Sequence, residues 1–301
     1  MGDLRQPNMG PARLRELLAG DRLIVAPGAY DALSARLIEQ AGFDTVYMTG
    51  YGASASLLGR PDIGLLSFGE MADHARRLVQ AVTVPVIADA DTGYGNPLNV
   101  IRTVREYAAA GVAALHIEDQ AIPKRCGHMG GKQVIPQEDM VEKVRAAVDA
   151  RGSSELILIA RSDARADEGL DRAIERVMSY RDAGADLVFI DALQSEDEII
   201  AFGEALPDTP KVINWVEGGR TPFVDPHRLR ELEFRVMFCS LAALLAATSA
   251  VQARLVRLRE LAAPQPVSAL AFEQFNELIG MPDVAALETR FTFGKTDRGS
   301  F

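Results

Sequence analysis

The sequence predicts a (β/α)8 TIM barrel, an α/β fold in which parallel strands alternate with helices. Short runs rich in Val, Ile and Leu recur along the chain, and stretches with helical periodicity separate most of them. The runs are almost continuously apolar, which is typical of parallel strands covered on both faces. A doubly wound open sheet is the alternative, but it would need a glycine-rich phosphate turn that the sequence does not show.

Eight strands are predicted, at 23–26, 45–48, 84–88, 114–117, 156–159, 187–190, 211–214 and 235–238. The helical stretches that precede new strands span 32–41, 68–82, 98–110, 138–150 and 170–183. Gly42, Gly111 and Gly184 stand where a glycine commonly ends a helix. Pro136 and the pair Asp225-Pro226 are typical of helix starts.

Beyond the last strand, the sequence predicts extra C-terminal helices. We expect one barrel domain over residues 1–301, with 241–301 as its helical extension. A long Ala- and Leu-rich helix spans 241–262 and ends at Pro264 and Pro266, and 268–294 again carries apolar residues at helical spacing. An apolar helical tail must bury one face, either on its own barrel or on a neighbouring subunit, and we favour the neighbouring subunit.

Composition narrows the class of protein. Apolar residues make up 48% of the chain and charged residues 25%, as in globular proteins with a sizeable core. No apolar run approaches the roughly 18 residues of a membrane span, and the first 13 residues contain no export signal. We therefore expect a cytoplasmic protein without a membrane partner. The net charge of −10 argues against nucleic acid, and the two cysteines form no disulfide framework.

Acidic residues gather where active sites of such barrels are built, at the C-terminal ends of the strands. Asp89 and Asp91 follow the third predicted strand, Glu118 ends the fourth, and Asp62 lies in the loop after the second. Mg²⁺ prefers oxygen ligands, so the four acids predict a metal site. The alternative for any single acid is to cap the following helix.

Other strand ends carry groups suited to anions. Residues 49–52 combine small side chains with free backbone N–H groups. Arg161 follows the fifth strand and can hold a carboxylate through two hydrogen bonds, or form a salt bridge to Asp163 or Glu118. His116 alternates with apolar residues, so it is either a core histidine or a site residue.

The most distinctive stretch is the loop 124–132, with the sequence KRCGHMGGK. Its three glycines indicate a loop that can move or close. Cys126 stands beside Lys124, Arg125 and His128, surroundings that are expected to lower a thiol pKa. We therefore expect a functional thiol here. Cys239 ends an apolar run and is expected to be an inert, buried thiol.

Five motifs, in this order, resemble the isocitrate lyase / phosphoenolpyruvate mutase superfamily. They are DADTGYG at 89–95, HIEDQ at 116–120, KRCGH at 124–128, ARSDA at 160–164 and NWVEGG at 214–219. The resemblance runs from about residue 23 to the C-terminus, and the acidic motif combined with the Lys-x-Cys-Gly-His loop makes it specific. That loop is typical of the carbon–carbon lyase branch, whereas the phosphonate mutases generally lack its cysteine.

The resemblance implies a barrel with a swapped C-terminal helix, usually in a homotetramer built as a dimer of dimers. It also implies Mg²⁺, or Mn²⁺ in its place, held most closely by Asp89 and largely through water by Asp62, Asp91 and Glu118. Tyr47 matches a proposed base on the 2-hydroxyl and Cys126 matches the general acid, with Lys124 and His128 expected beside them as catalytic residues. The residues implied in carboxylate binding are Thr49, Gly50, Tyr51, Gly127, His128, Arg161, Asn214 and Asp191, the last standing where many relatives have Glu.

The function implied is Mg²⁺-dependent cleavage of a 2-hydroxy di- or tricarboxylate, such as 2-methylisocitrate or 2,3-dimethylmalate, to a 2-oxo acid such as pyruvate and a second carboxylate. Residues 129–132 are closer to the isocitrate and dimethylmalate enzymes, residues 275–279 resemble the petal-death and dimethylmalate group, and the large insertions of true isocitrate lyases are missing. The alternatives are a carboxyphosphonoenolpyruvate mutase-type phosphorus–carbon enzyme, an oxaloacetate hydrolase or decarboxylase, and a catalytically silent metabolite-binding barrel.

Overall fold

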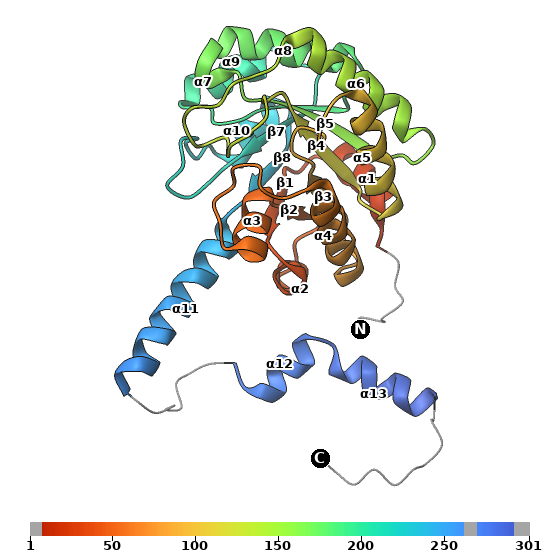
Figure 1. Ribbon diagram of the computed structural model, residues 1–301, viewed down its shortest axis with the longest axis vertical. Helices are drawn as coiled ribbons and strands as arrows, with labels where there is room; N and C mark the ends of the chain where they lie inside the picture. The colour runs from red at the N-terminus through yellow and green to blue at the C-terminus, as the bar shows by residue number, and fades with distance from the viewer. Residues whose placement is uncertain (1–7, 262–269, 292–301) are drawn as a thin grey trace. The chain divides into compact units, whose positions relative to one another are not determined.

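The computed structural model describes residues 8–261 and 270–291, and it contains the predicted TIM barrel (Figure 1). Eight strands pair in sequence order, each parallel to its neighbours, and β1 pairs with β8 to close the barrel. The strands are β1 (Ile24–Ala29), β2 (Val46–Met48), β3 (Val86–Asp89), β4 (Ala114–Glu118), β5 (Ile157–Ser162), β6 (Leu187–Ile190), β7 (Lys211–Asn214) and β8 (Phe234–Cys239). Each overlaps a predicted strand.

Helices surround the strands (Figure 1). They are α1 (Gly10–Ala19), α2 (Ala32–Gln40), α3 (Gly50–Leu58), α4 (Phe68–Ala81), α5 (Pro97–Ala109), α6 (Gln137–Arg151), α7 (Arg165–Glu168), α8 (Leu170–Asp182), α9 (Glu196–Ala205) and α10 (Pro226–Glu231). Gly42, Gly111 and Gly184 follow helix ends with φ of 88°, 87° and 109°, as predicted. Pro136 precedes α6 and Pro226 begins α10.

The barrel contains two apolar clusters because strand side chains alternate between its faces. In β5, Ile157 and Ile159 point into the barrel, whereas Leu158 and Ala160 pack beneath the surrounding helices. Leu14 of α1 joins the inner cluster. The interior is thus filled with side chains up to the level where the strands end, as in other barrels of this class.

The chain divides into two compact units, and Asn8–Thr248 is the unit that contains the barrel. The other unit contains the end of α11 (Ala242–Leu261), together with α12 (Phe272–Leu278) and α13 (Met281–Arg290). The extra helices are therefore confirmed, and Gly280, at φ 97°, separates the last two. Pro264 and Pro266 lie outside the described residues. One domain over residues 1–301, with 241–301 as its extension, stays a prediction. In residues 8–261 and 270–291, no helix is long and apolar enough to cross a membrane.

Candidate active site

The alternation of side chains along each strand brings the candidate residues together. In β5, Ile157 and Ile159 face the barrel interior, and the next residue on that face is Arg161. The same inward face in the other strands ends in Asp89, Glu118, Asp191, Asn214 and Ser240. These side chains surround a cavity of about 240 Å³ at the C-terminal ends of the strands.

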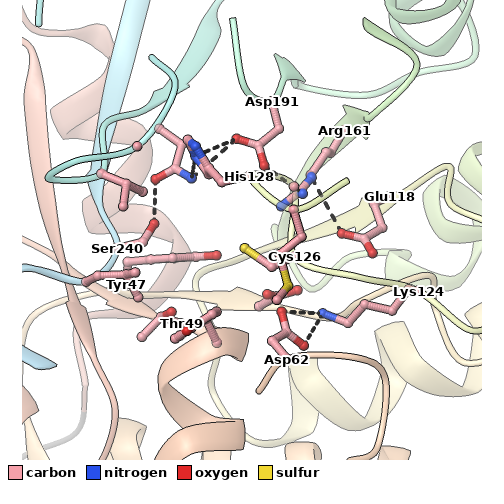
Figure 2. A pocket seen from close by; sticks show the side chains of 18 of the residues that line it. Tyr47, Thr49, Asp62, Glu118, Lys124, Cys126, His128, Arg161, Asp191 and Ser240 are labelled. Carbon is pink, nitrogen blue, oxygen red and sulfur yellow. Dashed lines mark hydrogen bonds and ion pairs between the residues drawn. The ribbon is translucent and has the colours of Figure 1, made fainter. Parts of the chain in front are cut away.

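Most predicted site residues line this cavity (Figure 2). They are Tyr47, Thr49, Tyr51, Asp62, Asp89, Glu118, Lys124, Cys126, Gly127, His128, Arg161, Asp191 and Asn214. The two predicted residues outside the lining lie beside it. Gly50 N–H donates to Asp89 Oδ2 at 3.2 Å, and Asp91 Oδ1 lies 2.6 Å from Lys124 Nζ. The sequence motifs thus meet at one place, although their chemical roles stay predictions.

Four buried acids, Asp62, Asp89, Asp91 and Glu118, lie together on one side of the site and are called the floor acids below. Lys124 Nζ bridges two of them, at 2.7 Å from Asp62 and 2.6 Å from Asp91 (Figure 2 shows its contacts with Asp62). Asp89 accepts hydrogen bonds from the N–H groups of Asp91 and Gly50. Glu118 Oε2 lies 3.5 Å from Arg161 Nε, whereas its buried Oε1 has no hydrogen-bond partner.

Burial acts on the pKa values of three of these acids, Glu118, Asp91 and Asp89. It raises the pKa of Glu118 well above its usual value although Arg161 and Lys124 oppose it, and it raises that of Asp91 to about 6. Burial also acts on Asp89, but His116, Lys124 and Arg161, together with the hydrogen bond from the Asp91 N–H, outweigh it and lower the pKa. Adjacent carboxyls thus hold their protons with different strength.

The four predicted metal ligands lie near one another, but they do not form a metal site in the described part of the chain. Within residues 8–261 and 270–291, no group of three or more His, Cys, Asp or Glu side chains is arranged to hold a metal ion. Lys124 provides the positive charge between Asp62 and Asp91. The donor set nevertheless fits a hard cation, because it consists of buried carboxylate oxygens and one of them, Glu118 Oε1, is unpaired.

Arg161 is already paired with acids. It forms two hydrogen bonds with Asp163, of 2.8 and 2.9 Å, and its Nη2 lies 2.7 Å from Asp191. The predicted salt bridge to Asp163 is therefore confirmed. Arg161 stands between Asp191 and Glu118 and still lines the cavity, so it also remains available to a carboxylate (Figure 2).

Cys126 faces the cavity, but the expectation that its pKa is lowered is wrong. Burial raises the pKa of this thiol to about 11, and Asp191 and Asp62 add to the effect. The positive neighbours in sequence do not reverse it, because Lys124 points toward the floor acids and Arg125 is exposed. Cys239 is partly buried, does not line the cavity, and likewise has its pKa raised to about 11 by burial.

His128 joins the loop to the opposite wall of the cavity. Its Nδ1 accepts a hydrogen bond from the N–H of Arg220 at 3.2 Å, and its Nε2 lies 3.7 Å from Asp191 Oδ1. Burial lowers the pKa of His128, which favours the neutral ring. Nδ1 is thus an acceptor, whereas Nε2 lies between Asp191 Oδ1 and the amide nitrogen of Asn214, which is 3.4 Å away.

His116 is both a core residue and a neighbour of the site. It is fully buried, its Nε2 lies 2.9 Å from Tyr47 Oη, and the same nitrogen is 3.6 Å from Asp89. Burial lowers the pKa of His116 to about 4 and raises that of Tyr47 well above 10, so both are neutral near pH 7. Tyr47 is therefore no ready-made phenolate base.

Sequence reasoning overlooked two polar residues here. Ser240 lies on the inward face of β8 beyond Phe238, and its hydroxyl donates to Asn214 Oδ1 at 2.5 Å. Strand alternation alone would have found it. Lys132 closes the quoted loop motif, but nothing in its spacing indicates that it turns inward, where it is 4% exposed.

Comparison with known proteins places the chain among enzymes of related chemistry. The family model described as phosphoenolpyruvate phosphomutase matches residues 14–259. The 2,3-dimethylmalate lyase of Eubacterium barkeri is 44% identical over 94% of this chain and 99% of its own. The chloroplastic carboxyvinyl-carboxyphosphonate phosphorylmutase of Arabidopsis thaliana is 43% identical (93% and 84%), and the 2-methylisocitrate lyase of Bacillus subtilis strain 168 is 41% identical (80% and 78%).

Solved structures agree with this placement. A crystal structure of 2,3-dimethylmalate lyase, a PEP mutase/isocitrate lyase superfamily member, matches with a TM-score of 0.91 at 36% identity, over 98% of this chain and 100% of the other. The structure of oxaloacetate acetylhydrolase in complex with the inhibitor 3,3-difluorooxalacetate matches with a TM-score of 0.90 at 38% identity, over 95% of this chain and 98% of the other. The structure of phosphonopyruvate hydrolase in complex with oxalate and Mg²⁺ matches with a TM-score of 0.85 at 31% identity, over 93% of this chain and 98% of the other.

Proposed function

The chain belongs to the PEP mutase/isocitrate lyase superfamily of enzymes, and from this premise we propose that it is a Mg²⁺-dependent carbon–carbon lyase. Its substrate in this proposal is a 2-hydroxy di- or tricarboxylate of the 2,3-dimethylmalate or 2-methylisocitrate type. The products are a 2-oxo acid such as pyruvate and a second carboxylate. The identity to two lyases of this kind, 44% and 41%, supports the proposal.

One observation carries the proposal: a protonated thiol faces a cavity that also contains carboxylate-binding groups. With a pKa of about 11, Cys126 keeps its proton near neutral pH and can donate it. Arg161, Asn214 and His128 line the same cavity and can bind a carboxylate. A carbanion formed between these groups would thus meet a proton donor.

The floor acids are the proposed Mg²⁺ ligands: Asp62, Asp89 and Glu118 line the cavity, and Asp91 lies beside it, joined to Asp62 through Lys124. Bound there, the ion would supply positive charge to the oxygen that becomes the carbonyl of the 2-oxo acid. The solved phosphonopyruvate hydrolase complex with oxalate and Mg²⁺ supports this choice of ion.

The remaining chemistry can be written for the protein's own side chains. The N–H of Tyr51, at the start of α3, would hold the carboxylate of the 2-oxo acid portion, because the N–H groups of Gly50 and Gly52 already donate to Asp89 and Thr49. The hydroxyl proton passes to Tyr47 while Tyr47 gives its own proton to Nε2 of the neutral His116, and the carbon–carbon bond breaks with its electron pair on the departing fragment. Cys126 then gives its proton to that carbon and becomes a thiolate, and the site regains the proton before the next turnover.

Hydrolysis of oxaloacetate is the second candidate, favoured by the TM-score of 0.90 to oxaloacetate acetylhydrolase. It would use the same carboxylate-binding groups. A phosphorus–carbon enzyme is the third, because a phosphorylmutase is 43% identical. Cys126 argues against that class, in which the cysteine is generally missing, and for the lyase.

A substrate panel tests the proposal. The purified enzyme with Mg²⁺ is given 2-methylisocitrate, 2,3-dimethylmalate, isocitrate, citramalate, oxaloacetate and phosphonopyruvate, and release of pyruvate, glyoxylate or oxalate is followed. We expect pyruvate from an alkyl-substituted acid. Oxalate from oxaloacetate alone would favour the hydrolase, and no turnover of any carbon acid would contradict the proposal.

The thiol is tested separately. Cys126→Ser should lower kcat on the accepted substrate by about 10²- to 10⁴-fold, the usual contribution of a general acid. Oxalate binding measured by calorimetry should stay within about twofold, because Ser leaves the anion-binding groups in place. Cys239→Ser is the matched control and should change neither quantity. Undiminished turnover by Cys126→Ser would remove the thiol from the mechanism.

For the assembly, we propose a helix-swapped homotetramer. Apolar side chains on α11 and α12 are left exposed in the single chain, among them Val251, Leu255 and Phe272, which is 79% exposed. Exposed apolar side chains grouped on consecutive helices support burial against another subunit.

A further inference from the structure

The loop between β4 and α6, which carries Cys126, is fastened at its base. The N–H groups of Ala121 and Ile135 donate to carbonyls of the opposite arm, at 2.7 and 2.8 Å. Higher in the loop, the Gln120 side chain forms two hydrogen bonds of 2.8 Å with the backbone of Arg125. These contacts fix where the two arms begin, so the position of the tip, 126–131, depends on other contacts.

Lys132 provides such a contact. Its side chain is buried at 4% exposure, and its Nζ donates to the carbonyl oxygen of Gly127. The same Nζ lies 3.2 Å from Asp163 Oδ1. Gly127 directly follows Cys126, so the ammonium holds the backbone that carries the thiol. Lys132 itself does not line the cavity.

The same carboxylate connects this contact to the anion-binding wall. Asp163 is 1% exposed and receives both the Lys132 ammonium and the two hydrogen bonds from Arg161. Its backbone N–H donates to Asp119 at 2.8 Å, which fixes it to the end of β4. One buried acid therefore sets the position of the loop relative to Arg161.

We propose that Lys132 is a positioning residue that holds the Cys126 loop closed over the cavity. The tip has three further anchors: Cys126 N–H donates to the Asp62 carbonyl at 3.1 Å, Arg220 N–H donates to His128 at 3.2 Å, and the Asn214 amide nitrogen lies 3.4 Å from His128 Nε2. Lys132 is the anchor that connects the loop to Asp163, the carboxylate that also accepts hydrogen bonds from Arg161. Its effect on turnover rests on the proposed function, whereas its effect on the loop does not.

Hydrogen exchange followed by mass spectrometry tests the loop directly. The amides of Cys126 and Met129 are hydrogen-bonded in the closed loop, to the carbonyls of Asp62 and Cys126. In Lys132→Met, we expect both amides to exchange at least tenfold faster than in the wild type, while Lys132→Arg keeps most of the protection. Arg125→Met removes an exposed charge from the same loop and should exchange like the wild type.

Kinetics on the substrate found in the panel give the second readout. Lys132→Met should lower kcat at least tenfold while KM changes less than threefold, because the loop carries the proton donor, and Lys132→Arg should recover part of kcat. Unchanged exchange in a folded Lys132→Met overturns the proposal. A second result would also overturn it and requires no variant: in the ligand-free wild-type enzyme, the Cys126 and Met129 amides exchange as fast as unprotected amides. If no substrate is turned over, the exchange data still decide the loop, and the lyase proposal fails alone.

Discussion

The thiol of Cys126 keeps its proton because of where it stands. The surrounding protein replaces the water that would stabilise a thiolate. The carboxylates of Asp191 and Asp62 also disfavour a negative charge on the sulfur. A nucleophilic cysteine needs the opposite setting, with a pKa below neutral pH. The same residue type in the same loop therefore serves as an acid, and its protonation is a measurable quantity.

The first prediction concerns this pKa. In a Cys239→Ser background, we expect iodoacetamide to modify Cys126 about 100-fold more slowly at pH 8 than a free cysteine whose pKa is 9, because the thiolate fraction falls tenfold per pH unit. The pKa is raised, so the rate should still be climbing at pH 10. Mass spectrometry of the modified peptide gives the rate, and circular dichroism at each pH checks the fold. A rate that levels off below pH 9 would contradict the assignment.

At the residue scale, sequence reasoning found types and positions but not environments. Arg161, Asp89 and Glu118 were identified because they end apolar strands, and the contact between Glu118 and Arg161 follows from the register, in which the two lie opposite each other. The pKa of Cys126 was misjudged because the chain neighbours of a residue do not report its burial. Lys132 was missed because its partner Asp163 follows β5 and is far from the Cys126 loop in the sequence.

At the scale of elements, the Cys126 loop is closed only because Gly127 has no side chain. A Cβ at this position would collide with the Asp191 carboxylate and the Arg161 guanidinium. A Cβ on Gly130, in the same loop, would meet nothing within 4 Å. The two glycines therefore serve different purposes, and the loop contains its own control position.

The second prediction uses this pair. Gly127→Ala should lower kcat about 10- to 100-fold, since overpacking costs about 1–3 kcal/mol and each 1.4 kcal/mol is a factor of ten in the closed population. Gly130→Ala should stay within about twofold of the wild type. Steady-state kinetics of both variants, with thermal melts to confirm folding, give the comparison. Equal kcat for the two variants would show that the loop does not close as described.

The helices show what local patterns can and cannot predict. Amphipathic stretches with caps, such as α4 and α5, were predicted within a few residues. The helix α3, with the sequence GYGASASLL, was not, because Gly and Ser are poor helix formers. Its start is fixed by the Thr49 hydroxyl, which accepts from Gly52 N–H, and by burial against the barrel. Tertiary packing decided this element.

At the scale of the whole molecule, the proposed tetramer can be measured by light scattering. The third prediction is that the wild type has four times the mass of one chain, and that Phe272→Lys gives smaller species, because a charge replaces an apolar side chain that the assembly would bury. Glu273→Lys, at the next exposed position of α12, is the control and should remain a tetramer. A monomeric wild type, or a tetrameric Phe272→Lys, would contradict the assembly.

The inward-facing side chains of each strand form a single row. Its first members fill the barrel interior, and its last members line the cavity at the C-terminal end. Shifting a strand by a single residue would turn Arg161 outward and swing an outer-layer residue into the barrel, so structure and chemistry would be lost together. Substitutions on the inward face of the strands therefore disturb core and site together. We expect substrate preference to be set instead by residues that loops contribute to the cavity, such as Met129, Val216 and Leu241, which shape it while the reacting groups stay in place.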